Sequence, residues 1–440
     1  MKQKSILLVL ALLSYLTGAA QVTNRQLPVA GDQLTLEECQ QLAQENYPLL
    51  KRYNLIQQTT EYSLQNINRG YLPQLVFSGQ ATYQSDVATL PELLTNLLAQ
   101  NGYAVKGLDK DQYRIALDLN QIIWDGGNLK AQKENVTAQG EIQTKQTDVG
   151  MYNIRERIND LYFGILLIED KIRLNQDLQT LLQSNCDKLE SMRQNGTAMQ
   201  ADVNAIRAEY LKTNQQLTEL TSMRQSFQQM LTLFIGKQVT ANTTLLKPNA
   251  TLPISLENLR PELQMFDAQL QQTEAQRRLL NSGVRPRLSL FAQGFYGYPG
   301  YNMFEDMFNH DFSLNGLVGV RLSWNISKLY THKNDKRKLV LAQNQIENAR
   351  EVFLFNNQLQ STQEQEAIER YRKMMSEDDE IIRLRTSVRQ AAEAKLKHGV
   401  IDVNNLLQEI TRENQARTNQ SSHEIEMLKH IYELRHTVNQ

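Results

Sequence analysis

The chain contains 440 residues with a formal net charge of −1, so its composition gives no electrostatic basis for nucleic-acid binding. Hydrophobic residues make up 41% of it and aromatic residues only 7%, with 9 prolines and 20 glycines. Together with long tracts rich in Gln, Asn, Glu, Lys and Leu, these proportions favour long helices over β-sandwiches and wound α/β domains.

The N-terminus has the features of a secretory signal. Residues 1–4 carry two lysines, residues 6–16 form a mainly apolar stretch, and small residues precede Gln21, which predicts a signal peptide over residues 1–20. No cysteine follows the predicted cleavage site, so no N-terminal lipid anchor is expected. After Gln21 no apolar run approaches the ~20 residues of a membrane-spanning helix. Any crossing of a membrane would therefore have to use strands.

The first helix is predicted to begin at Thr35. Thr35 and Glu38 have the spacing of a capping box, in which each side chain bonds the backbone N–H of the other residue. Pro48 is expected to interrupt this helix, because proline lacks the N–H that a helix interior requires. The helix then continues to about Arg69 and ends at Gly70.

Two segments with alternating apolar and polar residues follow, at 72–83 and 113–124. Regular alternation is typical of a strand with one apolar and one polar face. The connecting residues 84–112 are predicted to form a long loop with a short helix at 91–100. The apolar faces comprise Leu75, Phe77, Gly79, Ala81 and Tyr83 in the first segment and Tyr113, Ile115, Leu117 and Leu119 in the second.

A very long helix is predicted next. Residues 124–127 read Trp-Asp-Gly-Gly, which ends the second strand, and no proline interrupts residues 128–194. A helix over that range would be on the order of 100 Å long. Asn195 and Gly196 then form a tight break. Apolar residues spaced alternately by three and four predict a returning coiled-coil helix to Phe234.

The same order of elements then returns. A linker is predicted over residues 237–256, followed by a helix near 256–281 and two further strands at 287–298 and 316–324. Their apolar faces comprise Leu288, Leu290, Ala292, Gly294, Tyr296 and Tyr298 in the first strand and Gly316, Val318, Val320, Leu322 and Trp324 in the second.

A second long helix over residues 328–397, a turn at Gly399 and a returning helix complete this copy. Asp118 and Gly196 are separated by the same number of residues as Arg321 and Gly399. We therefore predict two structural repeats, over residues 21–236 and 257–440.

The four predicted strands cannot form an open sheet in lipid. Each unpaired backbone group there costs several kcal/mol, and the smallest membrane barrels have about eight strands. Several chains contributing four strands each would solve this problem. The alternative is a small sheet buried against helices, but polar faces rich in Gln, Asp, Arg and Asn fit a water-filled lumen better. The aromatic residues expected to face lipid are Phe77, Tyr83, Tyr113, Trp124, Tyr296 and Trp324.

Together these features resemble the TolC-like outer-membrane factors, the exit ducts of tripartite efflux pumps and type I secretion systems. The resemblance covers nearly all of the chain after the signal peptide. One copy departs from the pattern, because Asn325-Ile326-Ser327-Lys328 replaces the Trp-Asp-Gly-Gly break. The motifs are Leu34-Thr35-Leu36-Glu37-Glu38 with Pro48, Leu72-Pro73-Gln74-Leu75, Ile123-Trp124-Asp125-Gly126-Gly127, Arg285-Pro286-Arg287-Leu288, and the turns at Gly196 with Asp202-Val203 and at Gly399 with Asn405.

The resemblance implies a mainly α fold with membrane β structure. Long α-helical hairpins would form an α-barrel, and four β-strands per chain would join a trimeric 12-stranded β-barrel. The linker over residues 237–256 would lie in an equatorial region. The implied location is the outer membrane of a Gram-negative bacterium, with a large periplasmic part. The implied partners are two further copies, outer-membrane lipid, a periplasmic adaptor (membrane fusion protein) and, through it, an inner-membrane RND or ABC pump.

By the same resemblance, the protein would be a passive exit duct for drugs, metabolites or peptides. The best-known members carry aspartates where this chain has Asn405 and Gln408, so we expect an entrance that binds cations weakly. Ile401 and Leu396 replace the residues that latch that entrance. The adaptor is expected to dock on the hairpin tips at Gly196, Thr197, Gly399, Val400 and Ile401. The periplasmic pore constriction is expected at Asp202, Asp402, Asn405 and Gln408.

The sequence predicts neither catalysis nor a cofactor. No Ser-His-Asp, Cys-His, phosphate-loop or paired-carboxylate arrangement stands out, so the protein is not expected to be an enzyme. The six histidines show no clear metal-binding spacing, and no metal site is predicted. Cys39 and Cys186 lie on separate predicted helices and are expected to be unpaired, although spacing alone does not exclude a disulfide.

Two alternatives to small-molecule efflux remain open. The chain could be the outer-membrane component of type I protein secretion, which these residues do not separate from efflux. A rival from another class is a secreted coiled-coil scaffold or adhesin without a membrane barrel. Such a protein would be found outside the outer-membrane fraction.

Overall fold

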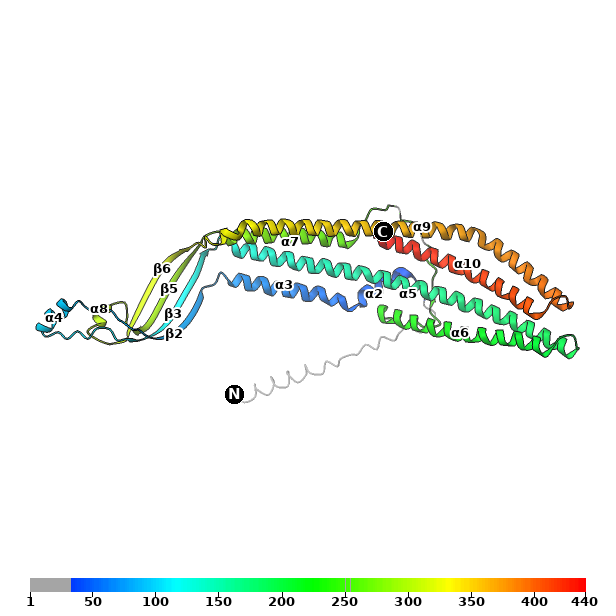
Figure 1. Cartoon of the computed structure of the whole chain (residues 1–440), viewed down its shortest axis with the longest axis horizontal. Coiled ribbons are helices and arrows are strands. Elements are labelled where there is room, and N and C mark those ends of the chain that lie inside the picture. The colour runs from blue at the N-terminus through cyan, green and yellow to red at the C-terminus, as the bar shows by residue number, and fades with distance from the viewer. Residues whose placement is uncertain (1–32, 250, 254) are drawn as a thin grey trace, which may run out of the picture. The chain divides into compact units, whose positions relative to one another are not determined.

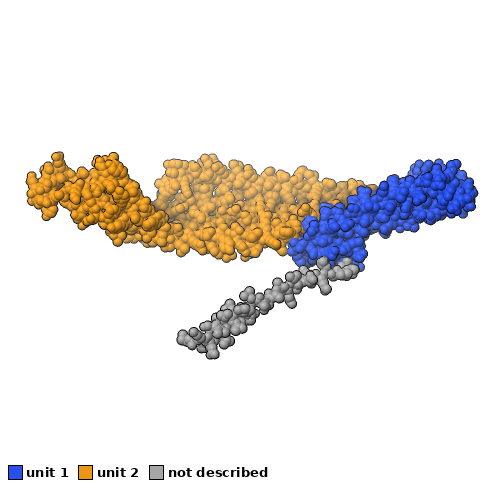
Figure 2. Space-filling model, turned by 90° about the horizontal axis from the view of Figure 1, so that it is seen from below, with its two compact units in different colours: residues 1–46, 158–249, 377–425 blue, residues 47–157, 250–376, 426–440 orange. Residues whose placement is uncertain are grey.

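The computed structural model describes residues 33–249, 251–253 and 255–440 (Figure 1). The predicted signal peptide, residues 1–20, lies outside the described residues. The chain divides into two compact units (Figure 2). The first unit comprises the described residues of 1–46, 158–249 and 377–425, and the second those of 47–157, 250–376 and 426–440. Each predicted repeat contributes to both units.

In the first unit, helix α2 (Leu36–Asn46) begins as predicted. The N–H of Thr35 donates to Glu38 Oε2 at 2.9 Å, and the N–H of Glu38 donates to Thr35 Oγ1 at 3.1 Å, which confirms the capping box. Leu36, Cys39 and Ala43 recur at helical spacing and are fully buried, and α2 packs against α6 (Gln200–Ile235).

A two-stranded parallel sheet was not predicted. Strand β1 (Gln33–Leu34) pairs with β4 (Thr244–Leu245), which lies inside the predicted linker. The buried hydroxyl of Tyr162 lies 2.8 Å from the carbonyl oxygen of Leu34 and 2.6 Å from that of Leu246. This contact fastens the linker to the start of the described chain.

Two helical hairpins account for most of the described residues (Figure 1). The first comprises α5 (Asn128–Gln194) and α6, and the second α9 (Lys328–Lys397) and α10 (Val403–Val438). The predicted bounds of both long helices are confirmed. The returning helices α6 and α10 have 36 residues each. The long helices differ, with 67 residues in α5 and 70 in α9, so the constant sequence offset between the two copies does not hold at the start of the long helices. No helix in the described part of the chain combines the length and apolarity that a membrane span requires.

Prolines set the helix starts in the second unit. A short 3₁₀ turn, η1 (Pro48–Leu50), precedes α3 (Lys51–Arg69), which confirms the predicted interruption at Pro48. Helix α7 (Pro261–Gly283) begins later than the predicted residue 256. The reason is that a residue before proline is driven to extended backbone, and Arg260 has ψ of 144°.

The second unit also carries a four-stranded antiparallel sheet with strand order β2-β3-β5-β6. The register places Phe77 opposite Leu117, Leu117 opposite Gly294 and Gly294 opposite Gly316. The four predicted strands are therefore confirmed, and their apolar sides form one face. The elements are β2 (Gln74–Tyr83), β3 (Asp111–Trp124), β5 (Arg287–Tyr298) and β6 (Ser313–Ser323), with α4 (Glu92–Gln100) and α8 (Met303–Asp306) in the connecting loops.

A buried aromatic stack joins α5 to the end of α10 in the second unit. The rings of Tyr152 and His436 lie 4.3 Å apart and nearly parallel, and the Tyr152 hydroxyl donates to the carbonyl oxygen of His436. Burial, followed by the nearby positive charges of Arg260 and Arg155, lowers the pKa of His436 to about 4. The imidazole is therefore neutral near pH 7 and packs as an aromatic ring.

Candidate functional site

The apolar face of the sheet is exposed on the chain. Phe77 in β2 is 75% exposed and Val318 in β6 is 70% exposed. The six aromatic residues predicted to face lipid are all exposed. Tyr83, Tyr113 and Tyr296 lie at the end of the strands next to the α4 and α8 loops, and Trp124 and Trp324 lie at the opposite end, where α5 and α9 begin. The sheet therefore carries an apolar band with aromatic residues at both ends.

The opposite face of the sheet is polar. Arg114 in β3 donates to Gln293 in β5 at 2.5 Å, and Gln293 donates in turn to Asp118 in β3. The guanidinium of Arg114 lies 3.9 Å from the ring centre of Phe295, and that of Arg321 lies 4.4 Å from Phe291. These contacts between strands position the long charged side chains. The polar face is therefore suited to face water.

Both helical hairpins turn with the same backbone geometry. The N–H groups of Gly196 and Thr197 donate to carbonyl oxygens three and five residues back, at 3.0 and 2.9 Å, and those of Gly399 and Val400 do the same at 2.9 Å each. This is a Schellman motif, which requires positive φ at the first of the two residues. Gly196 has φ of 74° and Gly399 has φ of 70°, and glycine adopts this conformation without steric cost.

The predicted docking residues lie at these turns. Gly196, Thr197, Gly399 and Val400 are exposed, with Val400 69% exposed, whereas Ile401 is half-buried. An exposed apolar side chain at the tip of a helical turn is available to a partner, but the contact itself remains a prediction.

The two aspartates predicted at the constriction accept backbone hydrogen bonds at the starts of α6 and α10. Asp202 accepts a hydrogen bond from the N–H of Met199 at 2.8 Å, and Asp402 accepts one from the N–H of Asn405 at 2.8 Å. Asp402 is the residue before α10, whereas Asp202 lies inside the first turn of α6. The two aspartates therefore occupy different positions relative to the starts of their helices. Asn405 and Gln408 are exposed. A place for these four residues at a pore remains a prediction.

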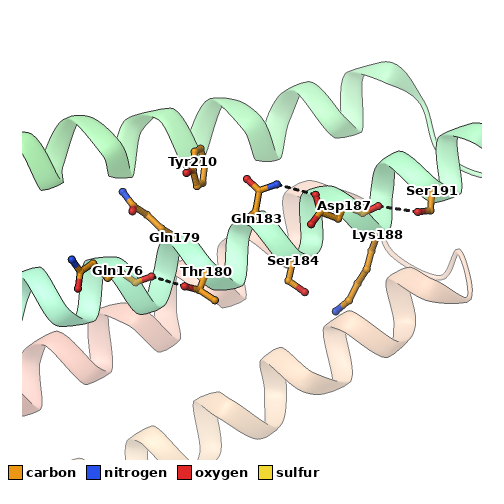
Figure 3. Close-up of a pocket in the computed structure, with 9 residues that line it drawn as sticks. All are labelled: Gln176, Gln179, Thr180, Gln183, Ser184, Asp187, Lys188, Ser191 and Tyr210. Atoms are coloured by element: carbon orange, nitrogen blue, oxygen red, sulfur yellow. Dashed lines mark hydrogen bonds between the residues drawn. The ribbon is translucent and has the colours of Figure 1, made fainter.

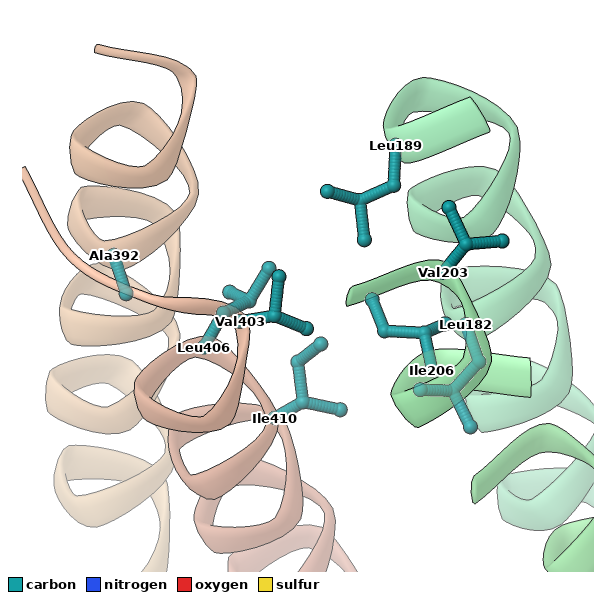
Figure 4. Close-up of a cluster of buried hydrophobic side chains, with 8 residues drawn as sticks. All are labelled: Leu182, Leu189, Val203, Ile206, Ala392, Val403, Leu406 and Ile410. Atoms are coloured by element: carbon teal, nitrogen blue, oxygen red, sulfur yellow. The ribbon is translucent and has the colours of Figure 1, made fainter. Parts of the chain in front are cut away.

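An apolar cluster joins the two hairpins close to their turns, within the first unit. Figure 4 shows its side chains pointing toward one another from α5, α6, α9 and α10. Ile401 and Leu396 pack against its edge. The buried members are Leu182, Leu189, Val203, Ile206, Ala392, Val403, Leu406 and Ile410.

A buried ionic network holds α9 to α10 beyond this cluster. Glu413 accepts hydrogen bonds from Thr386 at 2.9 Å, from Arg417 at 2.8 Å and from Arg389. Arg389 also contacts Glu393 at 2.8 Å. Burial raises the cost of ionising Glu413, but the hydrogen bonds from Arg417, Arg389 and Thr386 outweigh it and lower the pKa of this carboxyl. The Glu413 carboxylate therefore stays ionised at neutral pH.

A polar surface pocket of about 750 Å³ lies on the first hairpin (Figure 3). Eight of its lining residues come from α5, and Tyr210 comes from α6. Gln183 donates to Asp187 at 2.8 Å, so part of the lining is already bonded within its own helix. The α5 residues are Gln176, Gln179, Thr180, Gln183, Ser184, Asp187, Lys188 and Ser191.

No protein-family model matches the chain, and no curated protein matches its sequence. Solved structures do match. The outer-membrane channel OprN matches with a TM-score of 0.68 at 14% identity, over 92% of this chain and 89% of that one. The Campylobacter jejuni outer-membrane channel CmeC matches with a TM-score of 0.65 at 12% identity, over 92% and 85%. This chain has the outer-membrane channel fold.

The open state of the outer-membrane channel MtrE from Neisseria gonorrhoeae matches as well, with a TM-score of 0.64 at 14% identity, over 92% of this chain and 88% of that one. The TolC-like architecture expected from the motifs is thus confirmed at the level of the fold. In this chain the fold combines two long helical hairpins with a four-stranded sheet.

Several features of the channel fold in this chain were not found from sequence. The Glu413 network joins residues on separate helices, and the apolar cluster joins four helices. The sequence signals for the network were the i to i+4 spacings of Glu413 with Arg417 and of Arg389 with Glu393, which are common on helix surfaces. The pocket left no signal, because its Gln and Ser side chains resemble any polar helix face.

Proposed function

We propose that this chain is the outer-membrane exit channel of a tripartite export system in a Gram-negative bacterium. The observation that carries the proposal is the apolar, aromatic-ended face of the sheet, combined with a polar opposite face and two long helical hairpins. Strands of 10 to 14 residues are long enough to cross the hydrocarbon core of a bilayer when tilted. The likeness to solved outer-membrane channels supports this assignment.

The edges of the sheet support assembly with further copies. β2 and β6 are the edge strands, and both present exposed apolar side chains, including Phe77 and Val318. A long apolar edge strand invites pairing with another strand. Successive strands of the sheet run antiparallel, so β6 of one copy can accept β2 of the next without a change of pattern. Three copies, each contributing four strands, would close one barrel with the polar faces inside.

The hairpin turns are the proposed docking surface for a periplasmic adaptor. Met199 and Val400 are exposed apolar side chains beside the two hydrogen-bonded Schellman turns. Through the adaptor, the channel would receive drugs, metabolites or peptides from an inner-membrane RND or ABC pump. The channel performs no catalytic step in this proposal, and Asp202, Asp402, Asn405 and Gln408 would line its periplasmic constriction.

Purified protein reconstituted in planar bilayers is expected to give stepwise ion conductance, and cell fractionation is expected to recover it in the outer membrane. Deleting the gene should also reduce export, of small molecules for an efflux system or of a protein for type I secretion. Recovery from the periplasm or medium, with no conductance, would favour the secreted scaffold or adhesin instead.

A further inference from the structure

Three metal-ligating side chains meet between α9 and α10 in the second unit. Nδ1 of His430 lies 2.6 Å from an oxygen of Glu364 and 3.0 Å from an oxygen of Glu433. One ligand atom from each of the three residues lies within 4.8 Å of the other two. His430 and Glu433 are three residues apart on α10 and so share a face, whereas Glu364 comes from α9.

The surroundings hold these side chains in place and leave an approach from solvent. The Glu364 side chain is buried, while those of His430 and Glu433 remain about one fifth exposed. The ring of Tyr371 stacks on the His430 imidazole with ring centres 5.6 Å apart, which fixes the plane of the imidazole. A buried apolar cluster flanks the group on the same two helices; its members are Ile368, Ile431 and Leu434.

Two carboxylates and one imidazole converge at this point. Nδ1 of His430 lies within hydrogen-bond distance of an oxygen of each glutamate. Lys429 adds one positive charge, 3.5 Å from the other oxygen of Glu433. A dication placed between the three ligand atoms would contact the imidazole nitrogen and one oxygen of each carboxylate.

We propose that Glu364, His430 and Glu433 form a binding site for a divalent transition-metal ion such as Zn²⁺, which joins α9 to α10. One imidazole nitrogen and two carboxylate oxygens supply three ligands and leave a fourth tetrahedral position for water. The nitrogen ligand and the small number of oxygens favour Zn²⁺ over Ca²⁺ or Mg²⁺. Helix bundles build metal sites in the same way, from a Glu/His pair three residues apart on one helix and a carboxylate on a facing helix.

The test is a Zn²⁺ titration of the full-length protein, purified in detergent and stripped of metal with a chelator. Calorimetry is expected to show one ion bound per chain in the wild type, and added Co²⁺ is expected to give the visible absorption of a coordinated ion. E364Q and E433Q should each weaken Zn²⁺ binding by about tenfold or more.

D378N is the matched control for these variants. Asp378 lies 2.9 Å from Nδ1 of His423 between the same two helices, but the described residues supply no third ligand there. D378N should therefore bind Zn²⁺ as the wild type does. The proposal is overturned if the wild type binds no stoichiometric Zn²⁺, if E364Q and E433Q bind as tightly as the wild type, or if D378N weakens binding equally. Because the wild-type titration needs no substitution, a variant that fails to fold does not remove the test.

Discussion

Replacing Val318 by arginine is expected to remove most of the protein from the outer-membrane fraction. Val318 lies at the middle of β6 on the apolar face, where the proposed function places lipid. An arginine at the bilayer midplane costs roughly 2–4 kcal/mol in a membrane strand, and every copy in an assembly would carry that cost. The measurement is the share of V318R recovered in outer membranes after fractionation, compared with the wild type.

L317R is the matched control for V318R. Leu317 is the preceding residue of the same strand and is also exposed, but its side chain points to the polar face, so an arginine there would meet water. We expect L317R to reach the outer membrane in near wild-type amounts. Equal recovery of the two variants would contradict the assignment of the faces.

The second large effect is expected from E413A. Removing this carboxylate leaves the Arg389 guanidinium, whose side chain is only 12% exposed, without its buried partner. Loss of one member of a buried ion pair typically costs about 3–5 kcal/mol. Amide hydrogen exchange in the α9 and α10 segments around residues 386–417 should therefore accelerate by roughly two orders of magnitude or more. The four-stranded sheet, which belongs to the second unit, should exchange as in the wild type.

The control for E413A is E380A. Glu380 pairs with Arg383 at 2.6 Å on α9, but both side chains are more than half exposed, so exchange should not change measurably. The pH dependence follows from the lowered pKa of Glu413. Its contribution to stability is present above the unfolded pKa of about 4.3 and is lost as the pH falls through the lower folded value. Equal exchange in E413A and E380A would show that the network does not hold the hairpin.

The elements of this fold were predictable where a local rule decides them. Period-two alternation located all four strands of the sheet, because each strand has one apolar and one polar face. The lack of proline between residues 128 and 194 and the positive φ required at Gly196 fixed the first hairpin. The capping box at Thr35 is an equally local signal.

The remaining features depend on contacts between distant segments. Each strand of the β1–β4 pair has only two residues, too few for any periodicity, and it exists because the chain returns to Leu34 from far along the sequence. Thr386, which bonds Glu413, and Glu364, which bonds His430, lie on α9 rather than α10, at a distance in sequence that no spacing rule covers. For the metal-ligand group, the spacing of three residues between His430 and Glu433 is visible in the sequence. A search for paired histidines alone does not find this group.

Edge-to-edge joining of the sheets of neighbouring copies can be measured by disulfide trapping between β6 and β2. In cells producing a variant with Cys39 and Cys186 replaced, S78C in β2 is combined in turn with L317C and G319C in β6. Within one chain these strands are three strand spacings of about 4.8 Å apart, too far for a disulfide. S78C with A116C is the control, since these positions face each other within one chain.

Covalent oligomers up to a trimer, found in the outer membrane, are expected for at least one β6–β2 pair, and only monomer is expected for the control. Monomer alone for every β6–β2 pair, from protein that is present in the cell, would contradict edge-to-edge joining.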